Sequence, residues 1–286
     1  MISVIVPAYN EEEAIAEVMT RINNVMLSTK QKYEIIVVDD GSKDRTSEII
    51  SKIKNVKTIK HPYNKGYGAA LKTGILNSNG EWILITDADG TYPVEDVPKL
   101  LEHVPNYDMV VGSRTGISVA IPISRRPAKF MLSKLANYIT NKDIPDLNSG
   151  LRVFRKDMAM RFMHLYPSGF SFTTTITLAS LSNDYSVKYV PINYEKRKGK
   201  SKMRSSDFFG FNTLMLKMMM YFKPLKIFVP TAVIISLLGL GWFIHDIVFF
   251  QNIAELSVFL LLAGLQIGLI GLVADLVATE KNRHHN

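Results

Sequence analysis

The sequence has no cysteine among its 286 residues, and this absence removes several kinds of chemistry at once. Without thiols the chain has no disulfides, no cysteine-ligated zinc and no cysteine nucleophile. No Gly-x-Gly-x-x-Gly motif follows the first apolar run, which argues against a dinucleotide-dependent dehydrogenase. The first residues also lack the charged region, long apolar core and cleavage site of a signal peptide. We therefore expect the N-terminal part of the chain to stay in the cytosol.

Charged residues are missing from two segments near the C-terminus, 227–244 and 256–274. Each segment is long enough to cross a hydrocarbon core about 30 Å thick, so we expect two transmembrane helices. Lysine and arginine flank the pair on both outer sides, but the connector 245–255 contains neither. Because positive charge favours the cytoplasmic side, both termini are expected in the cytoplasm of a multi-pass cell-membrane protein.

The second apolar segment has a face of small residues, Gly264, Gly268 and Gly271. Such a face lets two helix backbones approach closely, either with the first segment or with another copy of the chain. A homo-oligomer is therefore left open. The net charge of +8 and the pI near 9.4 fit either nucleic acid or an anionic membrane surface. Since the chain has no nucleic-acid motif, the membrane is the expected partner.

Short apolar runs alternate with helix-like stretches in the first half of the chain. The runs are 2–6, 34–39, 82–86 and 109–111. Nearly continuous apolar runs of this length are typical of parallel strands buried on both faces. The alternation predicts an α/β fold with a doubly wound sheet. In such sheets ligands bind beyond the carboxyl ends of the strands, so the polar clusters at 39–42, 87–91 and 112–114 should converge.

Two further stretches, 124–140 and 207–221, have helical apolar patterns. They are either core helices or amphipathic helices at the membrane interface. The resulting organisation is a cytosolic domain over 1–205, a juxtamembrane helix over 206–224 and two transmembrane helices over 225–280.

Asp87 and Asp89 directly follow an apolar run, and residues two apart in an extended segment point to the same side. Their carboxylates can share one hard cation, Mg²⁺ or Mn²⁺. Such a cation stabilises the diphosphate that leaves when a nucleotide sugar is cleaved. The glycine-rich segment 64–70 is either a phosphate-binding loop or an ordinary helix start.

Six short motifs occur in one order along 1–205. They are Val-Pro-Ala-Tyr-Asn-Glu-Glu at 6–12, Val-Asp-Asp-Gly-Ser at 38–42, Asp-Ala-Asp-Gly at 87–90, Gly-Ser-Arg at 112–114, Asn-Ser-Gly at 148–150 and Gly-Lys-Ser-Lys at 199–202. Together they resemble glycosyltransferase family 2. The fold of that family is GT-A, which is Rossmann-like, and the resemblance is to its polyprenyl-phosphate branch, which includes dolichyl-phosphate mannose and glucose synthases. The Gln-x-x-Arg-Trp signature of processive polysaccharide synthases is absent, which favours a single transfer per binding event.

The resemblance implies a role for each matching residue on the donor side. Pro7, Tyr9 and Glu11 border the nucleotide, Asp39 contacts its base or ribose, and Asp89 is the more direct metal ligand. Mannose synthases of the family place a metal-binding glutamine where this chain has Thr91, whose hydroxyl can still serve as a ligand. The full expected donor set is Pro7, Tyr9, Glu11, Asp39, Asp40, Lys65, Asp87 and Asp89, with Asp87, Asp89 and Thr91 at the metal.

A lipid phosphate is the expected acceptor, because a phosphate monoester is already ionised at neutral pH and needs positive charge more than a base. Arginine can hold phosphate oxygens with two parallel hydrogen bonds, and lysine adds a mobile charge. Asp146 lies where some family members place a catalytic base. The expected catalytic residues are Asp89, Arg114, Asp146, Arg126 and Arg197. The expected phosphate-binding residues are Arg114, Arg126, Lys129, Ser133, Arg197, Lys200 and Lys202.

Two other functions stay open at the level of sequence. One is a membrane-anchored family 2 enzyme that acts on a glycan, glycolipid or protein. The other is a non-catalytic scaffold that binds nucleotide sugar. Which sugar, base and polyprenol the protein uses is not encoded in these motifs.

Overall fold

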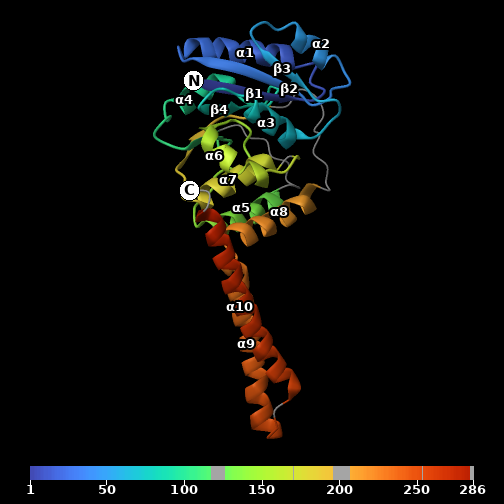
Figure 1. Cartoon of the computed structure of the whole chain (residues 1–286), viewed down its shortest axis with the longest axis vertical. Helices are drawn as coiled ribbons and strands as arrows, with labels where there is room; N and C mark the ends of the chain where they lie inside the picture. The colour runs from blue at the N-terminus through green and yellow to red at the C-terminus, as the bar shows by residue number, and fades with distance from the viewer. Residues whose placement is uncertain (117–125, 170, 196–206, 253, 284–286) are drawn as a thin grey trace. The chain divides into compact units, whose positions relative to one another are not determined.

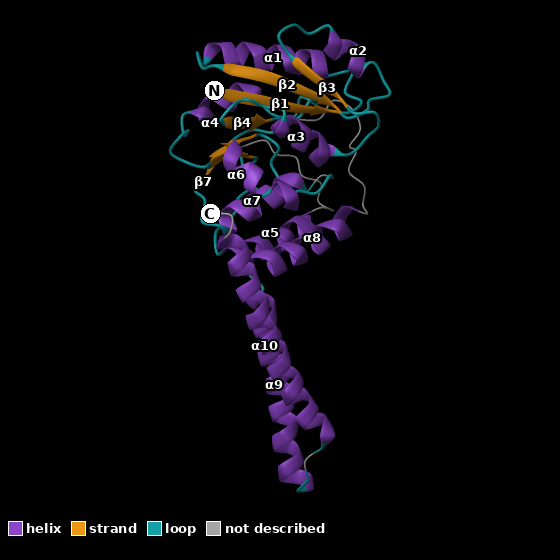
Figure 2. Cartoon of the chain, in the orientation of Figure 1, coloured by secondary structure: helices purple, strands orange, loops and turns teal. Residues whose placement is uncertain are grey.

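The structure is a computed structural model that describes residues 1–116, 126–169, 171–195, 207–252 and 254–283. The chain divides into two compact units, Met1–Phe211 and Asn212–Asn286, which are described separately. Figure 1 labels the helices and strands along the chain, and Figure 2 distinguishes them by colour.

The first unit is built on a seven-stranded sheet with the order β3-β2-β1-β4-β6-β5-β7. Strand β6 is antiparallel to both of its neighbours, and every other pair in the sheet is parallel. The strands are β1 (Ile2–Ala8), β2 (Tyr33–Asp39), β3 (Lys57–Lys60), β4 (Trp82–Ile85), β5 (Met109–Ser113), β6 (Arg152–Arg155) and β7 (Val187–Pro191).

The central strands are buried on both faces, which explains their continuous apolar runs. In β2, Ile35 and Val37 join the core formed with α1, whereas Ile36 and Val38 pack with Ala70 of α3 on the opposite face. The predicted α/β fold with helices on both faces of the sheet is confirmed. The helices of this unit are α1 (Ile15–Ser28), α2 (Thr46–Ser51), α3 (Tyr67–Leu76), α4 (Val97–Leu101), α5 (Arg126–Thr140), α6 (Lys156–Arg161) and α7 (Phe172–Ser182), with short 3₁₀ turns at Val94–Asp96 and Met163–Leu165.

The sheet is mixed rather than wholly parallel, and this differs from the expectation. Strand β6 has only four residues, two of them arginine, so its sequence carries no apolar run. In the register of the sheet, Arg152 pairs with Ile85 of β4 and with Val111 of β5. The segment that precedes β6 therefore lies beyond the carboxyl ends of β4 and β5, next to the expected site.

Helix α7, like β6, was not predicted from the sequence. All ten residues from Phe172 to Leu181 are buried, although four of them are threonines. Thr175 and Thr177 donate their hydroxyls to the carbonyls of Ser171 and Thr173, one turn earlier. This bonding to the preceding turn satisfies polar groups inside an otherwise apolar environment.

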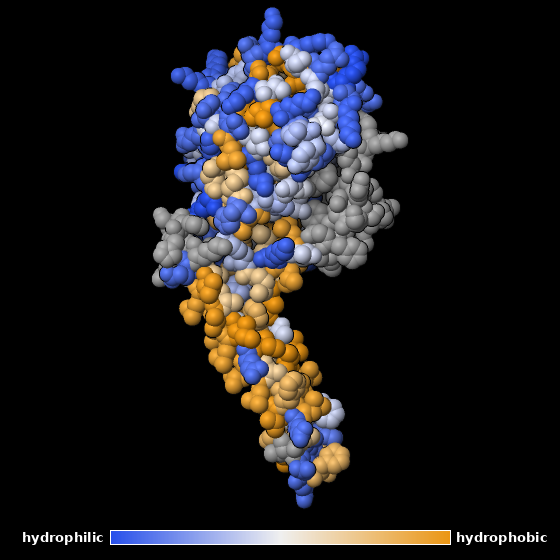
Figure 3. All heavy atoms as spheres, turned by 45° about the vertical axis from the view of Figure 1, so that its right-hand side comes forward, coloured by the Kyte–Doolittle hydropathy of each residue, from blue (hydrophilic) through white to orange (hydrophobic). Residues whose placement is uncertain are grey.

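The second unit contains two long apolar helices, α9 (Leu225–His245) and α10 (Glu255–Arg283), joined through a π turn at Asp246–Phe250. Segments Leu225–Phe250 and Glu255–Glu280 are long and apolar enough to span a membrane. Their outward side chains form an apolar surface along both helices, coloured orange in Figure 3. Helix α8 (Asp207–Phe222) crosses the boundary between the two units.

The small-residue face of α10 packs against α9. A Cβ atom added at Gly264 would meet the side chain of Ser236, and one added at Gly271 would meet Phe228. Of the two partners that the sequence left open for this face, the first apolar segment is in contact with it, and only glycine permits these close approaches.

Candidate active site

Polar residues follow three neighbouring parallel strands of the sheet. Tyr9 and Glu11 follow β1, Asp39 ends β2, and Asp87 follows β4. Arg114 follows β5, which runs in the same direction as β4 because antiparallel β6 lies between them. The predicted convergence of the strand-end clusters at one edge of the sheet is confirmed.

The loops after β1 and β2 are tied together by hydrogen bonds. The Asn10 amide donates to Ser42 Oγ at 3.0 Å, and the Lys43 amide donates to Asn10 Oδ1 at 2.8 Å. The Glu11 amide donates to Thr46 Oγ1 at 2.8 Å. Asn10 has a φ of 50°, a left-handed conformation that asparagine tolerates. Helix α1 therefore begins only at Ile15.

Asp39 and Asp40 are both buried and accept hydrogen bonds from the loops around them. Asp39 accepts the Ser42 amide at 2.9 Å and the Ser47 hydroxyl. Asp40 accepts the Lys65 amide at 2.9 Å, and its other oxygen accepts the Gly66 amide at 2.8 Å. Asp40 also contacts His61 Nδ1 at 2.6 Å. Asp40 thus holds the chain that leads into α3.

The glycine-rich start of α3 does not offer its backbone to a phosphate. The Gly68 amide donates to the Gly169 carbonyl at 3.1 Å, and the Ala69 amide donates to the Ser168 carbonyl at 3.0 Å. A Cβ atom at Gly68 would lie 2.1 Å from the Pro167 carbonyl oxygen, so glycine is required for packing. The interpretation of 64–70 as a phosphate loop is therefore wrong. The exposed Lys65 ammonium lies 5.7 Å from the centre of the Tyr63 ring.

The acidic pair is oriented by hydroxyl groups. Asp89 Oδ1 accepts the Thr91 amide at 3.0 Å and the Thr91 hydroxyl at 2.7 Å. Asp87 Oδ1 accepts the hydroxyl of Tyr67 at 2.9 Å. Burial, together with the charge of Asp87, raises the pKa of Tyr67 well above its ordinary value, so Tyr67 stays a donor. A Cβ atom at Gly150 would lie 3.0 Å from both Asp87 oxygens, so the carboxylate lies directly against that glycine.

The carboxylates of Asp87 and Asp89 fit a divalent cation that takes its remaining ligands from water and from substrate phosphates. The described part of the chain has no group of three or more histidine, cysteine or acidic residues able to hold a metal. Two carboxylates at one strand end match Mg²⁺, which is usually held by one or two carboxylates, water and substrate phosphates. Whether the Thr91 hydroxyl also serves as a ligand stays a prediction.

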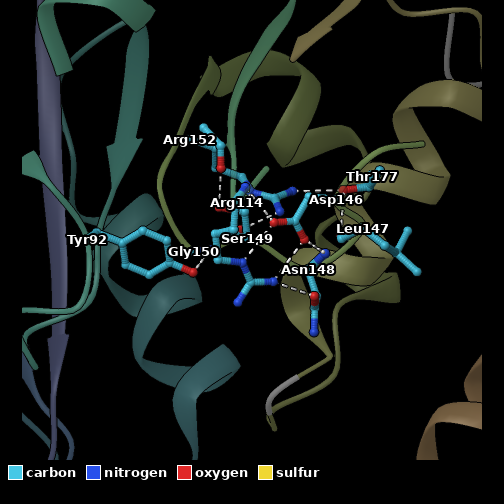
Figure 4. Close-up of polar contacts among 10 residues, drawn as sticks. Tyr92, Arg114, Asp146, Leu147, Asn148, Ser149, Gly150, Arg152 and Thr177 are labelled. Carbon is cyan, nitrogen blue, oxygen red and sulfur yellow. Dashed lines mark hydrogen bonds and ion pairs between the residues drawn. The ribbon is translucent and has the colours of Figure 1, made fainter. Parts of the chain in front are cut away.

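Arg114 forms a tight ion pair on the other side of the site (Figure 4). Asp146 Oδ2 accepts the backbone amide of Arg114 at 2.9 Å and its Nε at 2.8 Å. Arg114 Nη2 donates to Asp146 Oδ1 at 2.8 Å and to Asn148 Oδ1 at 2.7 Å. Burial opposes the charge of Arg114, but nearby Tyr92 and bonded Asp146 outweigh it and raise its pKa.

Two tyrosines pack beside this ion pair. Tyr92 and Tyr194 meet edge to face with ring centroids 5.3 Å apart, and the Arg114 guanidinium lies 5.2 Å from the Tyr194 centroid. The Tyr92 hydroxyl accepts the Gly150 amide at 2.6 Å. The loop after β4 is thereby joined to the segment before β6.

Comparison with known families supplies the assignment that this geometry leaves open. Residues 3–162, more than half of the chain, match the family described as glycosyl transferase family 2. The chain belongs to glycosyl transferase family 2. Residues 223–279 match the GtrB C-terminal hairpin, which agrees with the two apolar helices and makes this glycosyltransferase a membrane protein.

Relatives of this glycosyltransferase include the dolichyl-phosphate hexose transferase of Haloferax volcanii. The two are 31% identical over 204 residues, which cover 71% of this chain and 86% of the relative. The low-salt glycan biosynthesis hexosyltransferase Agl6 of the same organism is 32% identical over 71% of this chain, but the match spans only 50% of Agl6.

A solved structure shares the fold of the glycosyltransferase domain. It is glucosyl-3-phosphoglycerate synthase from Mycobacterium tuberculosis in complex with Mn²⁺, UDP and phosphoglyceric acid. The TM-score is 0.59 at 18% identity, and the match covers 76% of this chain and 78% of that one. The GT-A fold expected from the sequence is thus confirmed.

The structure describes only some of the other basic residues that were expected in the site of this glycosyltransferase. Arg126 and Lys129 lie on α5, but their side chains are outside the described part of the structure, and Ser133 on the same helix is half-buried. Arg197, Lys200 and Lys202 lie outside the described residues. Pro7 is buried in β1 opposite Val38.

Tyr67, Tyr92 and Tyr194 are members of the site that were not predicted from the sequence. Tyr92 stands directly after Thr91, and its position beyond a strand end was the available signal. Tyr67 and Tyr194 carried no such signal, because they reach the site only through the packing of α3 and of the chain after β7.

Proposed function

We propose that this glycosyltransferase transfers a single hexose-type sugar from a UDP- or GDP-sugar to a polyprenyl phosphate, dolichyl or undecaprenyl. The observation that carries the proposal is that one edge of the sheet holds an acidic pair at β4 and a fixed arginine at β5, in a chain with a GtrB-type hairpin. The name of the Haloferax relative, a dolichyl-phosphate hexose transferase, supports the same acceptor.

The donor binds on the side of β1, β2 and β4 in this proposal. Pro7, Tyr9, Glu11 and Asp39 border the nucleotide, on loops that are hydrogen-bonded to each other. Asp87 and Asp89 hold Mg²⁺ or Mn²⁺, which supplies positive charge to the leaving diphosphate. Asp40 and the backbone of Lys65 support these loops from inside, so we assign them no direct contact with the nucleotide.

The acceptor phosphate binds on the side of β5. One of its oxygens attacks the anomeric carbon, the bond from that carbon to the diphosphate oxygen breaks, and the configuration inverts. The phosphate is already ionised at neutral pH, so no base has to remove a proton. Asp146 accepts three N–H groups of Arg114 and is 1% exposed, so we assign it to orienting Arg114 rather than to base catalysis.

The remaining expected residues keep their places in this proposal. The domain 1–205 is cytosolic, 206–224 is a juxtamembrane helix, and 225–280 spans the membrane with both termini in the cytoplasm. Further phosphate-binding residues are proposed in α5 and in the segment after β7: Arg126, Lys129, Ser133, Arg197, Lys200 and Lys202.

The test uses the full chain purified in detergent with radiolabelled UDP- and GDP-sugars, a pure polyprenyl phosphate, and Mg²⁺ or Mn²⁺. A labelled lipid is expected with at least one sugar, and chelation of the cation should abolish it. A complete absence of lipid product from every sugar, with transfer to a glycan or protein instead, would overturn the proposed acceptor.

A further inference from the structure

The segment 146–149 is held by two arginines (Figure 4). Arg114 binds the side chains of Asp146 and Asn148. Arg152 binds the main chain of Ser149, the residue that follows them. Its Nε and Nη2 both donate to the Ser149 carbonyl, Nε at 3.0 Å and Nη2 at 2.5 Å. Within this segment, Arg114 therefore binds two side chains and Arg152 binds one carbonyl, that of Ser149.

The hydroxyl of Thr177 in α7 lies between Arg152 and the carbonyls of Thr173 and Leu147. Arg152 Nη1 donates to Thr177 Oγ1 at 2.9 Å and to the Thr173 carbonyl at 3.0 Å. The Thr177 hydroxyl lies 3.2 Å from the Leu147 carbonyl oxygen and 2.8 Å from that of Thr173. Leu147 stands between Asp146 and Asn148, the two residues that hold Arg114.

Arg152 is an unusual choice for a purely structural contact. It is 0% exposed, and within the described residues it contacts only neutral acceptors. Burial lowers the pKa of Arg152, but an arginine stays charged at neutral pH. A buried charge without a carboxylate partner costs free energy, which an apolar residue of similar volume avoids. Among the described residues, the two arginines Arg114 and Arg152 face one carboxylate, that of Asp146, so these three side chains together carry one net positive charge.

We propose that Arg152 is a positioning residue of the transfer reaction. It fixes the carbonyl of Ser149 directly and holds the Thr177 hydroxyl beside the carbonyl of Leu147, so that Asp146 and Asn148 hold Nε and Nη2 of Arg114 and leave its Nη1 edge for the acceptor phosphate. The inference rests on the proposed function and adds to it a residue that never touches the substrate. Because Arg152 acts on the acceptor side, we expect its substitution to change the affinity for the acceptor and not the affinity for the nucleotide sugar.

The test compares valine substitutions at two threonines of α7. Thr177→Val removes the hydroxyl between Arg152 and Leu147. Thr174→Val is the matched control, because Thr174 is equally buried on the same helix and its hydroxyl has no hydrogen-bond partner within the described part of the chain. In the full chain, Thr177→Val should raise the KM for polyprenyl phosphate about fivefold, as expected for one lost hydrogen bond, and leave the KM for the nucleotide sugar unchanged. Thr177→Ser keeps the hydroxyl and should recover most of the lost affinity.

A second variant addresses Arg152 directly. Arg152→Lys keeps the charge but cannot donate to Ser149, Thr173 and Thr177 together. If it folds, with a melting temperature near that of the wild type, it should raise the acceptor KM more than Thr177→Val does. Equal acceptor KM values for Thr177→Val and Thr174→Val would overturn the positioning role alone. Absence of lipid product from the wild type would overturn the proposed function and this inference with it.

Discussion

The two sides of the site are built in different ways. On the acidic side, Asp87 and Asp89 lie two residues apart after one strand, and Thr91 orients Asp89 from two residues further on. On the basic side, Arg114 is held by residues 32 and 34 positions later in the chain, which Arg152 and α7 support in turn. The acidic side is thus a local structure, whereas the basic side is a product of tertiary packing.

Because of this difference, substitutions on the two sides should affect transfer activity and folding stability differently. A substitution on the acidic side should remove a catalytic group and leave the fold intact. A substitution on the basic side should lower both the transfer activity and the stability of the fold, because the same ion pair holds β5 to the segment before β6.

Asp89→Asn should lower the transfer rate at least about 100-fold, since metal stabilisation of a leaving group is worth several kcal/mol. Asparagine keeps an oxygen that can accept the Thr91 amide and hydroxyl, so the melting temperature should change little. Asp157→Asn, at an exposed surface ion pair, is the control and should transfer normally. Near-normal turnover of Asp89→Asn would refute the metal assignment.

Asp146→Asn should destabilise the protein by about 3 kcal/mol, because it leaves the largely buried Arg114 without its carboxylate. The acceptor KM should rise in the same variant. Glu95→Gln is a matched control, since Glu95 also accepts Nε and Nη2 of an arginine, Arg21, but at the surface. Its cost should stay below about 1 kcal/mol. Equal losses of melting temperature in the two variants would contradict the distinction.

Tyr67→Phe should raise the Mn²⁺ concentration needed for half-maximal activity about tenfold, because it removes a donor that orients Asp87. Tyr166→Phe serves as the control, since the Tyr166 hydroxyl is buried and has no hydrogen-bond partner among the residues that the structure describes. Titration of activity with Mn²⁺ measures both. An unchanged requirement in Tyr67→Phe would show that Asp87 needs no such orientation.

The local character of the acidic side is also why the sequence predicted it. Asp87 and Asp89 follow an apolar run at a spacing whose geometry is known in advance. The two apolar helices were equally clear, because length and hydropathy alone define a membrane span. Convergence of the strand ends followed from the parallel order of β2, β1 and β4.

The basic side could be predicted only in part. Arg114 was identified from its place after β5, but its pairing with Asp146 depends on antiparallel β6, whose four residues give no periodic signal. Arg152 and Thr177 had no local pattern at all. In the case of the α3 start, glycines typical of a phosphate loop proved necessary for packing against 167–169, which only the tertiary structure reveals.

Glu34 provides the smallest predicted effect, at the amino end of β2 and away from both sides of the site. Its carboxylate accepts the Ser3 hydroxyl at 2.5 Å and the Asn79 amide at 2.6 Å. Burial opposes its charge, but these hydrogen bonds outweigh that cost and lower the pKa of Glu34. A lowered folded-state pKa stabilises the protein above the unfolded value of about 4.3, and this contribution is lost as the pH falls through the folded value.

Glu34→Gln should therefore lower stability by less than about 1 kcal/mol at neutral pH, since the carboxylate is partly exposed. The difference in melting temperature from the wild type should shrink as the solution is acidified below the ordinary pKa of glutamate. Glu102→Gln, at an exposed position, is the control for the general effect of removing one glutamate charge. Transfer activity should stay unchanged in both variants. A loss of activity in Glu34→Gln would show that the amino ends of the strands also influence the site.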